Sequence, residues 1–517
     1  MRYFNVSGPC NQRDHYMVEA AKRLQGAEQL IDMNQYFVIH AARQSGKTTY
    51  LQDLARRLNA AGKYHALVCS LEGLQGVVAP EKGIPQIVRT IKNALRFSPL
   101  PHAAEFAKDA DYEDFTGVLL TELTVFCMAL DKPLVVLFDE ADCLSENTLI
   151  SFLRQLRLGY NNRAMTPFVH SIALVGMRNI RDYKAKVRPD SESLGSASPF
   201  NVVTETLTLK NFTREEIVEL YGQHSEESGQ AFADGAVDLI LAQTQGQPWL
   251  VNAIAREVIV KLLQSDYRQP VTAALAEQAI EHIVWRRDTH IDSLLERLKE
   301  ARVRKIIEPM LMGQMVDIST DDFNYVRDLG LIRVTPARIE PANPIYGDVM
   351  VRTLNHYMQE SLARDEMTLP LPHYLKDGRI DMDFLLADFQ RFWRENSEIW
   401  KEKIEYKEAA PHLILMAFLQ RVLNGGGQIW REFAAGSGRT DLCLVHDQKK
   451  YPIELKIRRG AETLPDGLEQ ILKYMDTLGC AEGWLVIFDQ RAKVKWDDRL
   501  YMKKKTAAGK TVTVVGL

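Results

Sequence analysis

The chain has 517 residues, of which 46% are hydrophobic and 26% are charged. This composition excludes a mainly disordered or fibrous protein and supplies enough apolar material for several folded domains. The formal net charge of −4 argues against a protein that coats nucleic acid by bulk charge. The charge is uneven, since residues 396–517 carry 20 Lys and Arg against 16 Asp and Glu, while the preceding part is net acidic.

Cysteine usage and the absence of long apolar runs predict the compartment. The six cysteines form no Cys-x-x-Cys pair, which is typical of reduced thiols. The N-terminus shows no cationic segment followed by an apolar run, and no apolar stretch is long enough to span a bilayer. We therefore expect a cytoplasmic protein without membrane segments.

Apolar runs alternate with helical patterns over roughly the first 200 residues. A helix is predicted over 48–62, directly after the first run. The runs themselves predict strands over residues 36–40, 64–72, 133–140 and 168–177. Near-continuous apolar strands separated by helices are typical of a parallel sheet that is covered on both faces. The sequence therefore predicts an α/β core.

The pattern turns helical after Val203, and helices followed by a short hairpin-like piece then favour a winged helix. The stretch LPLPHYLKDGRIDMD is typical of a linker, and a new α/β unit follows it. The predicted parts are an ATPase-type core at 1–203, a helical lid at 204–293, a winged-helix-like domain at 294–360, a linker at 361–395 and a C-terminal α/β domain at 396–517.

A phosphate-binding loop is predicted directly after the first strand. It matches GxxxxGK[ST] with Ala41 in place of the first glycine, and a strand and a helix flank it as the motif requires. Backbone N–H groups at such a helix start surround phosphate oxygens, while Lys47 supplies charge and Thr48 offers a hydroxyl to Mg²⁺. The expected nucleotide-binding residues are Ala41, Ala42, Arg43, Gln44, Ser45, Gly46, Lys47, Thr48 and Thr49.

Acidic residues end the strand PLVVLFDE, about 90 residues beyond the loop. Asp139 is expected to hold Mg²⁺, and Glu140 to polarise the attacking water. A solvated acidic loop after a buried strand would have the same sequence pattern, but the upstream phosphate loop favours the catalytic interpretation. Arg178 follows the strand at 168–177 and is a weaker candidate, for a γ-phosphate contact or an arginine finger, with a surface basic cluster as the open alternative.

These motifs resemble the AAA+/STAND class of P-loop ATPases, especially its archaeal-ATPase-like branch, over residues 3–354. HAARQSGKTT resembles its Walker A motif and LVVLFDEAD its Walker B motif. Residues 244–250 resemble the GxP signature of its lid, which a helix C-cap followed by proline also explains. The resemblance implies ATP and Mg²⁺ as cofactors. It leaves a homo-oligomer through the ATPase domain open, since no sensor-2 arginine is assigned.

A second candidate site lies in a predicted β-hairpin. The strands DLCLVH and YPIELKIR are expected to be joined by a four-residue turn at 447–450, which pairs Asp441 with Lys456 and Cys443 with Glu454. Directly paired residues share a face, and so do residues two apart along a strand. Asp441, Glu454 and Lys456 would then project from one face, and a slip of one residue would break this arrangement.

Two carboxylates and a lysine on one face suit metal-assisted hydrolysis of a phosphodiester. Asp441 and Glu454 are expected to bind Mg²⁺ or Mn²⁺, and Lys456 to orient the nucleophile or stabilise the transition state. A surface hairpin with alternating charges is the alternative, but the apolar residues between the charges favour a central strand pair. Glu408, before an apolar helical stripe, is a further candidate metal ligand.

The arrangement resembles the PD-(D/E)xK nuclease superfamily over residues 400–490. Thr440–Asp441 stands at its PD position, the segment 454–456 matches ExK, and Glu408 matches the glutamate of its first helix. Gln470 and Tyr474 match the QxxxY element of RecB-like members. The resemblance implies a restriction-endonuclease-like α/β domain and nucleic acid, DNA first, as the partner. The basic segment 491–510 would track a nucleic-acid backbone or form a solvated tail.

The sequence thus predicts an ATPase whose nucleotide state gates or moves a DNA-directed, metal-dependent nuclease. A STAND-like signalling switch, whose C-terminal domain binds nucleic acid or protein without cutting, is the first alternative. An ATPase with a purely structural tail is the second. The complete set of Asp441, Glu454 and Lys456 favours cleavage.

Overall fold

The computed structural model describes residues 1–108, 115–176, 203–233, 235–286, 289–311, 320–336, 339–350, 353, 371–403, 415–416, 418–419, 422, 428–432, 441–458, 462–489, 491, 494–507 and 509–517. Two of the predicted site residues, Arg178 and Glu408, lie outside these ranges, and for Asp441 only the backbone is described. The chain divides into two compact units, Met1–Ile291 with Ser319–Arg333 and Asp292–Ile318 with Val334–Leu517.

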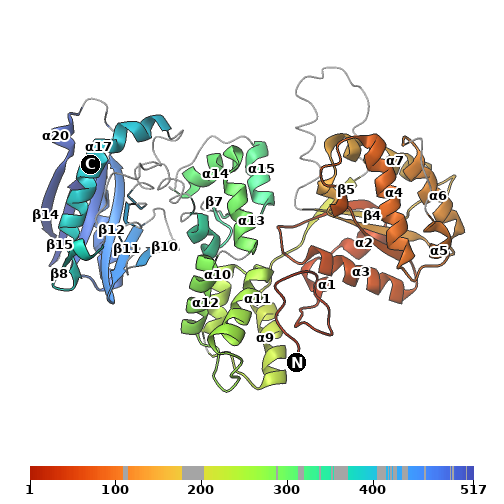
Figure 1. Cartoon of the computed structure of the whole chain (residues 1–517), viewed down its shortest axis with the longest axis horizontal. Helices are drawn as coiled ribbons and strands as arrows, with labels where there is room; N and C mark the ends of the chain where they lie inside the picture. Colours follow the sequence, from red (N-terminus) through yellow and green to blue (C-terminus); the bar gives the residue numbers. More distant parts are fainter. Residues whose placement is uncertain are drawn as a thin grey trace. The chain divides into compact units, whose positions relative to one another are not determined.

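The first unit is built around a parallel sheet (Figure 1). The strand order of this sheet is β2-β3-β4-β1-β5. Its strands are β1 (Tyr36–His40), β2 (His65–Ser70), β3 (Leu134–Asp139), β4 (Ser171–Gly176) and β5 (Val203–Thr208). The predicted α/β core is therefore confirmed, and the first four strands fall within the apolar runs that predicted them. β1 and β3 both run parallel to β4, which lies between them, so their carboxyl ends lie at the same edge, where nucleotides bind in such sheets.

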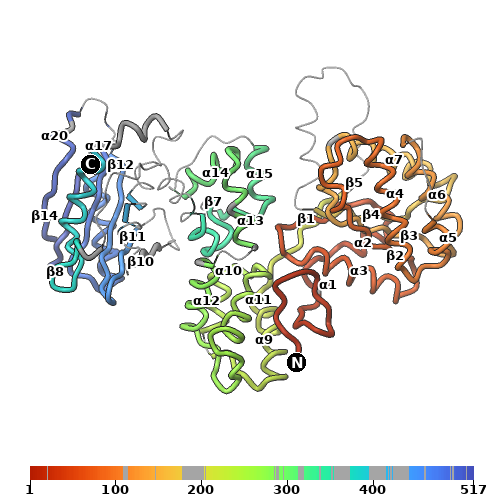
Figure 2. The backbone as a smooth tube through the Cα atoms, in the orientation of Figure 1, coloured from red at the N-terminus to blue at the C-terminus, as the bar shows by residue number. Residues whose placement is uncertain are grey.

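Helices cover both faces of this sheet (Figure 2). Val136 and Phe138 of β3 share one apolar cluster with helices α4 (Pro80–Arg96), α6 (Val118–Ala129) and α7 (Glu146–Asn162). Val135 and Leu137 point to the other face and share a cluster with α2 (Ala27–Asp32) and α3 (Lys47–Ala61). Because alternate residues of one strand are buried on opposite faces, the strand appears in the sequence as a continuous apolar run.

The chain does not turn helical at Val203, as the sequence predicts, but first adds the fifth strand. Among the described strands, β5 pairs with β1 and lies at the edge of the sheet. Glu205 and Thr208 are exposed there, so the strand lacks the apolar run that marks its neighbours. An edge strand needs less apolar surface because only one side is paired.

The helices after β5 belong to a region that we call the lid. α9 begins with a capping box, in which Thr213 and Glu216 each bond the other's backbone N–H. The lid helices are α9 (Arg214–Ser228), α10 (Ala236–Thr244), α11 (Pro248–Arg256), the π-helix η5 (Glu257–Leu262) and α12 (Ala273–Arg286). In the described part of the chain, no helix combines the length and apolar character that crossing a membrane requires.

In its described residues, the segment predicted as a winged helix contains a helical stretch over 344–350 and, besides it, three labelled helices and two short strands. These are α13 (Thr289–Leu298), α14 (Ala301–Leu311), α15 (Thr320–Asp328), β6 (Ile332–Val334) and β7 (Ile339–Pro341). β6 and β7 form a two-stranded sheet. The winged-helix assignment itself stays a prediction.

The C-terminal part of the second unit is a mixed sheet with the strand order β10-β11-β12-β13-β15-β14. Its strands are β10 (Gln428–Glu432), β11 (Asp441–His446), β12 (Lys449–Arg458), β13 (Glu482–Asp489), β14 (Tyr501–Ala507) and β15 (Lys510–Gly516). One face contacts α19 (Thr463–Leu478), whose Ile471 and Met475 share an apolar cluster with Leu485 and Ile487 of β13. The other face contacts α17 (Met382–Lys403), whose Phe389 and Trp393 rings lie against Phe488.

The sequence predicts a linker over 361–395, but residues 371–395 are part of this C-terminal fold. They form η6 (Leu371–Tyr374), the hairpin of β8 (Leu375–Lys376) and β9 (Arg379–Ile380), and most of α17. The Ile380 N–H donates to the Tyr451 hydroxyl at 3.0 Å, and Gln390 Nε2 donates to the Gly516 carbonyl at 2.7 Å. Asp377 and Gly378, within the stretch that suggested a linker, form a hairpin turn, with φ of 50° and 70°.

Candidate functional sites

The predicted phosphate loop joins the carboxyl end of β1 to the first residue of α3. Gly46, the last residue before the helix, has φ of 90°, a left-handed conformation that glycine adopts without strain. A Cβ at this position would lie 3.1 Å from Arg23 Nη1. The N-cap residue of α3 is Gly46, which has no side chain to bond the N–H groups of the first turn, so it leaves them to an anion.

Lys47 is buried beside this loop, with 6% of its surface exposed. Its Nζ donates to the carbonyls of Ala41 and Ala42, both at 3.1 Å. Burial lowers the pKa of Lys47, while the carboxylates of Glu140, Asp142 and Asp139 oppose that shift. The ammonium group is therefore held at the loop by backbone oxygens, with acidic groups around it.

The two acids predicted to work with the loop lie at the end of β3, which β4 separates from β1 in the sheet. Thr48 Oγ1 donates to Asp139 Oδ2 at 2.6 Å, and the Glu140 N–H donates to Asp139 Oδ1 at 3.0 Å. Glu140 has φ of 53°, a strained conformation that is characteristic of functional sites. Burial raises the pKa of Glu140, and the charge of Lys47 opposes the rise. The structure thus brings together Lys47, Thr48, Asp139 and Glu140.

Lid residues that resemble the GxP signature lie against the loop as well. Gln247 caps α11 by accepting a hydrogen bond from the Leu250 N–H, and Pro248 is the first helical residue. This confirms the interpretation as a helix end followed by a helix start. Gln247 Nε2 also donates to the Gln44 carbonyl at 3.4 Å, a contact that sequence reasoning did not predict.

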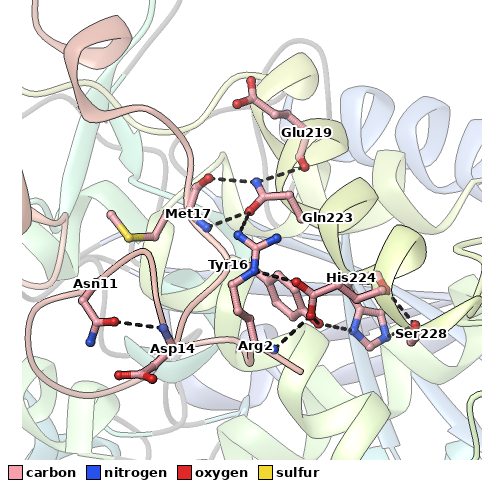
Figure 3. A network of polar contacts seen from close by, with 10 residues as sticks. Arg2, Asn11, Asp14, Tyr16, Met17, Glu219, Gln223, His224 and Ser228 are labelled. Carbon is pink, nitrogen blue, oxygen red and sulfur yellow. Dashed lines mark hydrogen bonds and ion pairs between the residues drawn. The ribbon is translucent and has the colours of Figure 1, made fainter.

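Residues 1–18, which we call the N-terminal strap, pack on the lid helix α9 (Figure 3). Arg2 pairs with Glu227, the Tyr16 hydroxyl donates to Glu227, and the Met17 backbone exchanges two hydrogen bonds with Gln223. Between these anchors, the Cys10 N–H donates to Thr49 Oγ1 at 3.0 Å. Sequence reasoning missed the strap because its partners are about 200 residues away, and no local pattern encodes such contacts.

The hairpin of the C-terminal sheet has a different register from the predicted one. Its turn has two residues rather than four: Asp447 and Gln448, with φ of 47° and 61°, as a type I′ turn requires. Leu442 pairs with Ile453, so one further step along the same register puts Asp441 opposite Glu454 rather than Lys456. A shift of two residues keeps the predicted face, because side chains alternate with a period of two.

Three of the predicted nuclease residues are in contact. Lys456 Nζ bonds to Glu454 Oε1 and to Gln470 Oε1 of α19. The side chains of Lys456 and Glu454 are 1% and 0% exposed. Gly467 allows this approach of α19, since a Cβ there would lie 3.2 Å from Lys456 Cγ. Tyr474 lies one helical turn beyond Gln470, in the apolar cluster under α19.

The carboxylate of Glu454 supplies the hard oxygen that Mg²⁺ or Mn²⁺ prefers. Among the described side chains, no group of three or more His, Cys, Asp or Glu is arranged to hold a metal ion. The two other predicted metal ligands of the nuclease, Asp441 and Glu408, have side chains outside that set. What the structure shows of this site is the Glu454–Lys456–Gln470 group.

Comparison with known proteins identifies the larger N-terminal part. The model of a family described as an AAA-like domain matches residues 9–351. The chain belongs to this family. A search of the curated proteins finds no match.

The AAA-like domain has the parallel sheet and loop of a P-loop fold, and solved structures resemble the chain at low identity. A Walker-type ATPase of Pyrococcus abyssi is 14% identical with a TM-score of 0.46, covering 67% of this chain and 99% of its own. The RuvB Holliday junction branch migration motor of Thermotoga maritima is 13% identical with a TM-score of 0.32, covering 61% and 87%. Cdc6p from Pyrobaculum aerophilum is 14% identical with a TM-score of 0.33, covering 66% and 97%.

Three of the eight basic residues of the segment 491–510 form ion pairs in the described part of the chain. Arg491 pairs with Asp489, Lys504 pairs with Asp383 at 2.7 Å, and Lys510 pairs with Asp476. The lysines of 503–505 lie on β14, the edge strand of the sheet, where exposed charge prevents pairing with another chain. These contacts give Arg491, Lys504 and Lys510 a structural role, and a nucleic-acid track along the segment 491–510 stays a prediction.

Proposed function

We propose that the AAA-like domain binds and hydrolyses ATP with Mg²⁺, and that the C-terminal sheet is a metal-dependent nuclease acting on DNA. The ATP site rests on one observation above all. Thr48 is hydrogen-bonded to Asp139 at the end of β3, and Lys47 lies close to that carboxylate. Hydroxyl, carboxylate and ammonium groups are the set that a nucleotide triphosphate and its magnesium ion require.

Each of these residues has a defined task. Lys47 neutralises charge on the β- and γ-phosphates, and the N–H groups at the start of α3 bind phosphate oxygens. Thr48 and Asp139 would hold Mg²⁺, which supplies charge neutralisation when bound. Glu140, next to Asp139, accepts the proton of the attacking water.

Nucleotide turnover by the Lys47→Ala variant tests the ATPase. We expect turnover to be abolished in this variant. Replacing Lys82, an exposed lysine of α4, by alanine is the matched control and leaves turnover unchanged. Turnover retained by Lys47→Ala would refute the site.

The nuclease proposal rests on the contact of Lys456 with Glu454 and Gln470, which come from a strand and a helix in the order ExK then Q. Continuing the printed register by one residue puts the backbone of Asp441 opposite Glu454, and the proposal takes Asp441 as the second carboxylate. Glu454 would hold the metal together with Asp441, and Lys456 stabilises charge on the phosphate. The metal, when bound, activates water for attack on the phosphodiester.

Incubation with a panel of DNA and RNA substrates and Mn²⁺, with and without ATP, tests the nuclease. We expect the wild type to cleave DNA and Glu454→Ala to lose cleavage. Glu482→Ala, on an exposed glutamate at the start of β13, is the matched control. Equal cleavage by the wild type and Glu454→Ala would discard the nuclease.

A module that binds without cutting is the second candidate, and one observation favours it. Glu454 is paired with Lys456 and fully buried, so a metal ion has to compete with the lysine for that carboxylate. A STAND-like switch would use this face to bind nucleic acid or protein. DNA binding without cleavage in the same Mn²⁺ assay distinguishes this function from the first.

A further inference from the structure

A buried arginine lies behind the phosphate loop and has no role in the site described so far. Arg23 is the last residue of α1 (Ala20–Arg23) and is 6% exposed. Its Nη2 donates to the Ser45 carbonyl at 2.8 Å and to the Lys210 carbonyl at 2.6 Å. Its Nε also donates to Lys210, at 3.1 Å, and its guanidinium lies 4.7 Å from the centre of the Phe212 ring.

The environment of Arg23 is costly for a cation. Burial lowers the pKa of Arg23 to about 10, and the charge of Glu216 opposes the shift. Within the described parts of the chain, no carboxylate forms an ion pair with it, and its hydrogen bonds go to backbone carbonyls. Packing alone would be served as well by an apolar side chain of similar length, since buried charge contributes little net stability.

The bond to Ser45 fixes the direction of a peptide group in the loop. A trans peptide points its C=O and N–H to opposite sides. Because the Ser45 carbonyl points to Arg23, the N–H of Gly46 points away from Arg23. Gly46 directly precedes Lys47, so this N–H belongs to the group that surrounds phosphates in such loops.

The bonds to Lys210 tie the same guanidinium to the start of the lid. Residues 209–213, which we call the lid hinge, connect β5 to α9. The Lys210 N–H donates to the Arg23 carbonyl at 3.3 Å, so Arg23 and Lys210 are bonded in both directions. Within the hinge, the Phe212 N–H donates to the Gly246 carbonyl at 2.8 Å, next to the Gln247 that bonds the loop.

We propose that Arg23 is a positioning residue that couples the phosphate loop to the lid hinge. Its guanidinium orients the Ser45–Gly46 peptide for phosphate binding, and the same group binds the Lys210 carbonyl in the lid hinge. Phosphate binding at the loop therefore changes the constraint on the hinge, and the lid responds. The inference rests on the proposed ATP site, and it adds how that site is connected to the lid.

Two substitutions separate this role from simple packing. Arg23→Met keeps the length of the side chain and removes every donor, whereas Arg23→Lys keeps the charge but cannot serve both carbonyls. Because a hydrogen bond from a charged group contributes about 1.5–3 kcal/mol, we expect Arg23→Met to bind ATP about 10- to 100-fold more weakly. Adenosine binding should change little, since adenosine has no phosphate.

Arg163→Met is the matched control, because Arg163 has the same kind of contacts elsewhere. It donates to the Asn34 carbonyl at 2.8 Å and stacks 3.7 Å from the Tyr160 ring. This variant is expected to bind ATP as the wild type does. Methylguanidinium added to Arg23→Ala is expected to restore part of the ATP affinity, which a packing defect alone would not allow.

Hydrogen exchange at residues 209–213, with and without saturating ATP, tests the coupling. In the wild type, ATP is expected to change exchange at the hinge, and in Arg23→Lys saturating ATP is expected to leave it unchanged. Wild-type ATP affinity in a folded Arg23→Met, or a full hinge response in Arg23→Lys, would overturn the inference. If Lys47→Ala also bound ATP normally, the proposed ATP site itself would fail, so the two failures are distinguishable.

Discussion

The loop site of the AAA-like domain and the hairpin site of the C-terminal sheet are assembled in opposite ways. The loop site uses the ends of parallel strands, where Thr48 meets Asp139 because β1 and β3 end at the same edge. The hairpin site uses the middle of a strand, where Glu454 and Lys456 lie under a helix. The lysines differ accordingly, since Lys47 contacts only carbonyl oxygens in its hydrogen bonds and Lys456 contacts a carboxylate.

The different partners of Lys47 and Lys456 indicate which charge each site can accept. Lys47, bonded to neutral oxygens, keeps its charge available for an anion that approaches the start of α3. Lys456 already neutralises Glu454, so a cation must displace that contact before it binds. The lysine of the loop is therefore held by neutral oxygens, whereas the lysine of the hairpin site is already paired with a carboxylate.

The largest expected effect separates hydrolysis from binding at the loop. Glu140→Gln removes the proposed general base and keeps the shape of the side chain, so ATP turnover should fall about 10²- to 10⁴-fold. ATP affinity should remain near that of the wild type, because Lys47 and Thr48 are untouched. Turnover and affinity are measured on the same preparation, and a parallel loss of both would place Glu140 in binding instead.

The buried pair of the hairpin site should dominate local stability. Lys456→Met leaves Glu454 buried without its cation and should destabilise the C-terminal sheet by about 3–5 kcal/mol. The double variant with Glu454→Gln should recover most of this loss, because no buried charge remains. Hydrogen exchange at the amides of β12 measures both. A Lys456→Met protein as stable as the wild type would show that the pair is not buried in solution.

The close approach of α19 can be tested with one methyl group. A Cβ on Gly467 would lie 2.8 Å from Leu485 Cδ1, so Gly467→Ala should cost about 1–3 kcal/mol by overpacking. Gly222→Ala is the control, since a Cβ there meets nothing within 4 Å and alanine favours a helix. Urea unfolding followed at the C-terminal sheet checks the difference, and equal stability of the two variants would contradict the packing described.

The pH dependence of ATP turnover should reveal the buried environment of Glu140. Burial raises the pKa of Glu140 above its usual 4.5, with Lys47 opposing and Asp142 adding to the rise. A base with a raised pKa is protonated sooner as the pH falls, so the acid limb of kcat/KM should lie above pH 4.5. Asp142→Asn should move that limb to lower pH. A limb that moves upward in this variant would contradict the electrostatics.

The smallest effect is expected at the surface of the strap. Arg2 and Glu227 form an ion pair whose side chains are 29% and 31% exposed, so Arg2→Ala should cost about 0.2–1 kcal/mol. Phe4 is 3% exposed and packs on Tyr16 and Tyr221, so Phe4→Ala should cost about 3–5 kcal/mol. Thermal unfolding compares them, and a reversed order would mean that the strap is held by charge.

The sequence predicted the loop site almost completely because its determinants are local. Lys47 and Thr48 are adjacent in the chain, so the motif could be recognised directly. β1 and β3 are buried on both faces, so each appears in the sequence as a continuous apolar run. Edge strand β5 was missed because exposed polar residues interrupt it. Arg23 and the strap were missed because their partners are distant in the chain, and hydrogen bonds to backbone carbonyls leave no pattern in residue types.

The hairpin site shows a different limit of sequence reasoning. The shared face of Glu454 and Lys456 was predicted because side chains alternate along any strand. The register was wrong because Asp447 and Gln448 form a type I′ turn without glycine, so nothing in the sequence marked the turn as short. Because the predicted register was wrong by two residues, an even number, Glu454 and Lys456 stayed on the predicted face of the strand. The contact of Gln470 with Lys456 could be anticipated only through the family resemblance.

Metal binding to the chain without nucleotide tests most directly whether two separate chemistries exist. Electron paramagnetic resonance counts bound Mn²⁺ in Asp139→Asn, which lacks the acid of the loop site. The account predicts that this variant still binds Mn²⁺ and that adding Glu454→Gln removes the binding. Equal Mn²⁺ binding by the single and double variants would contradict a metal site in the C-terminal sheet.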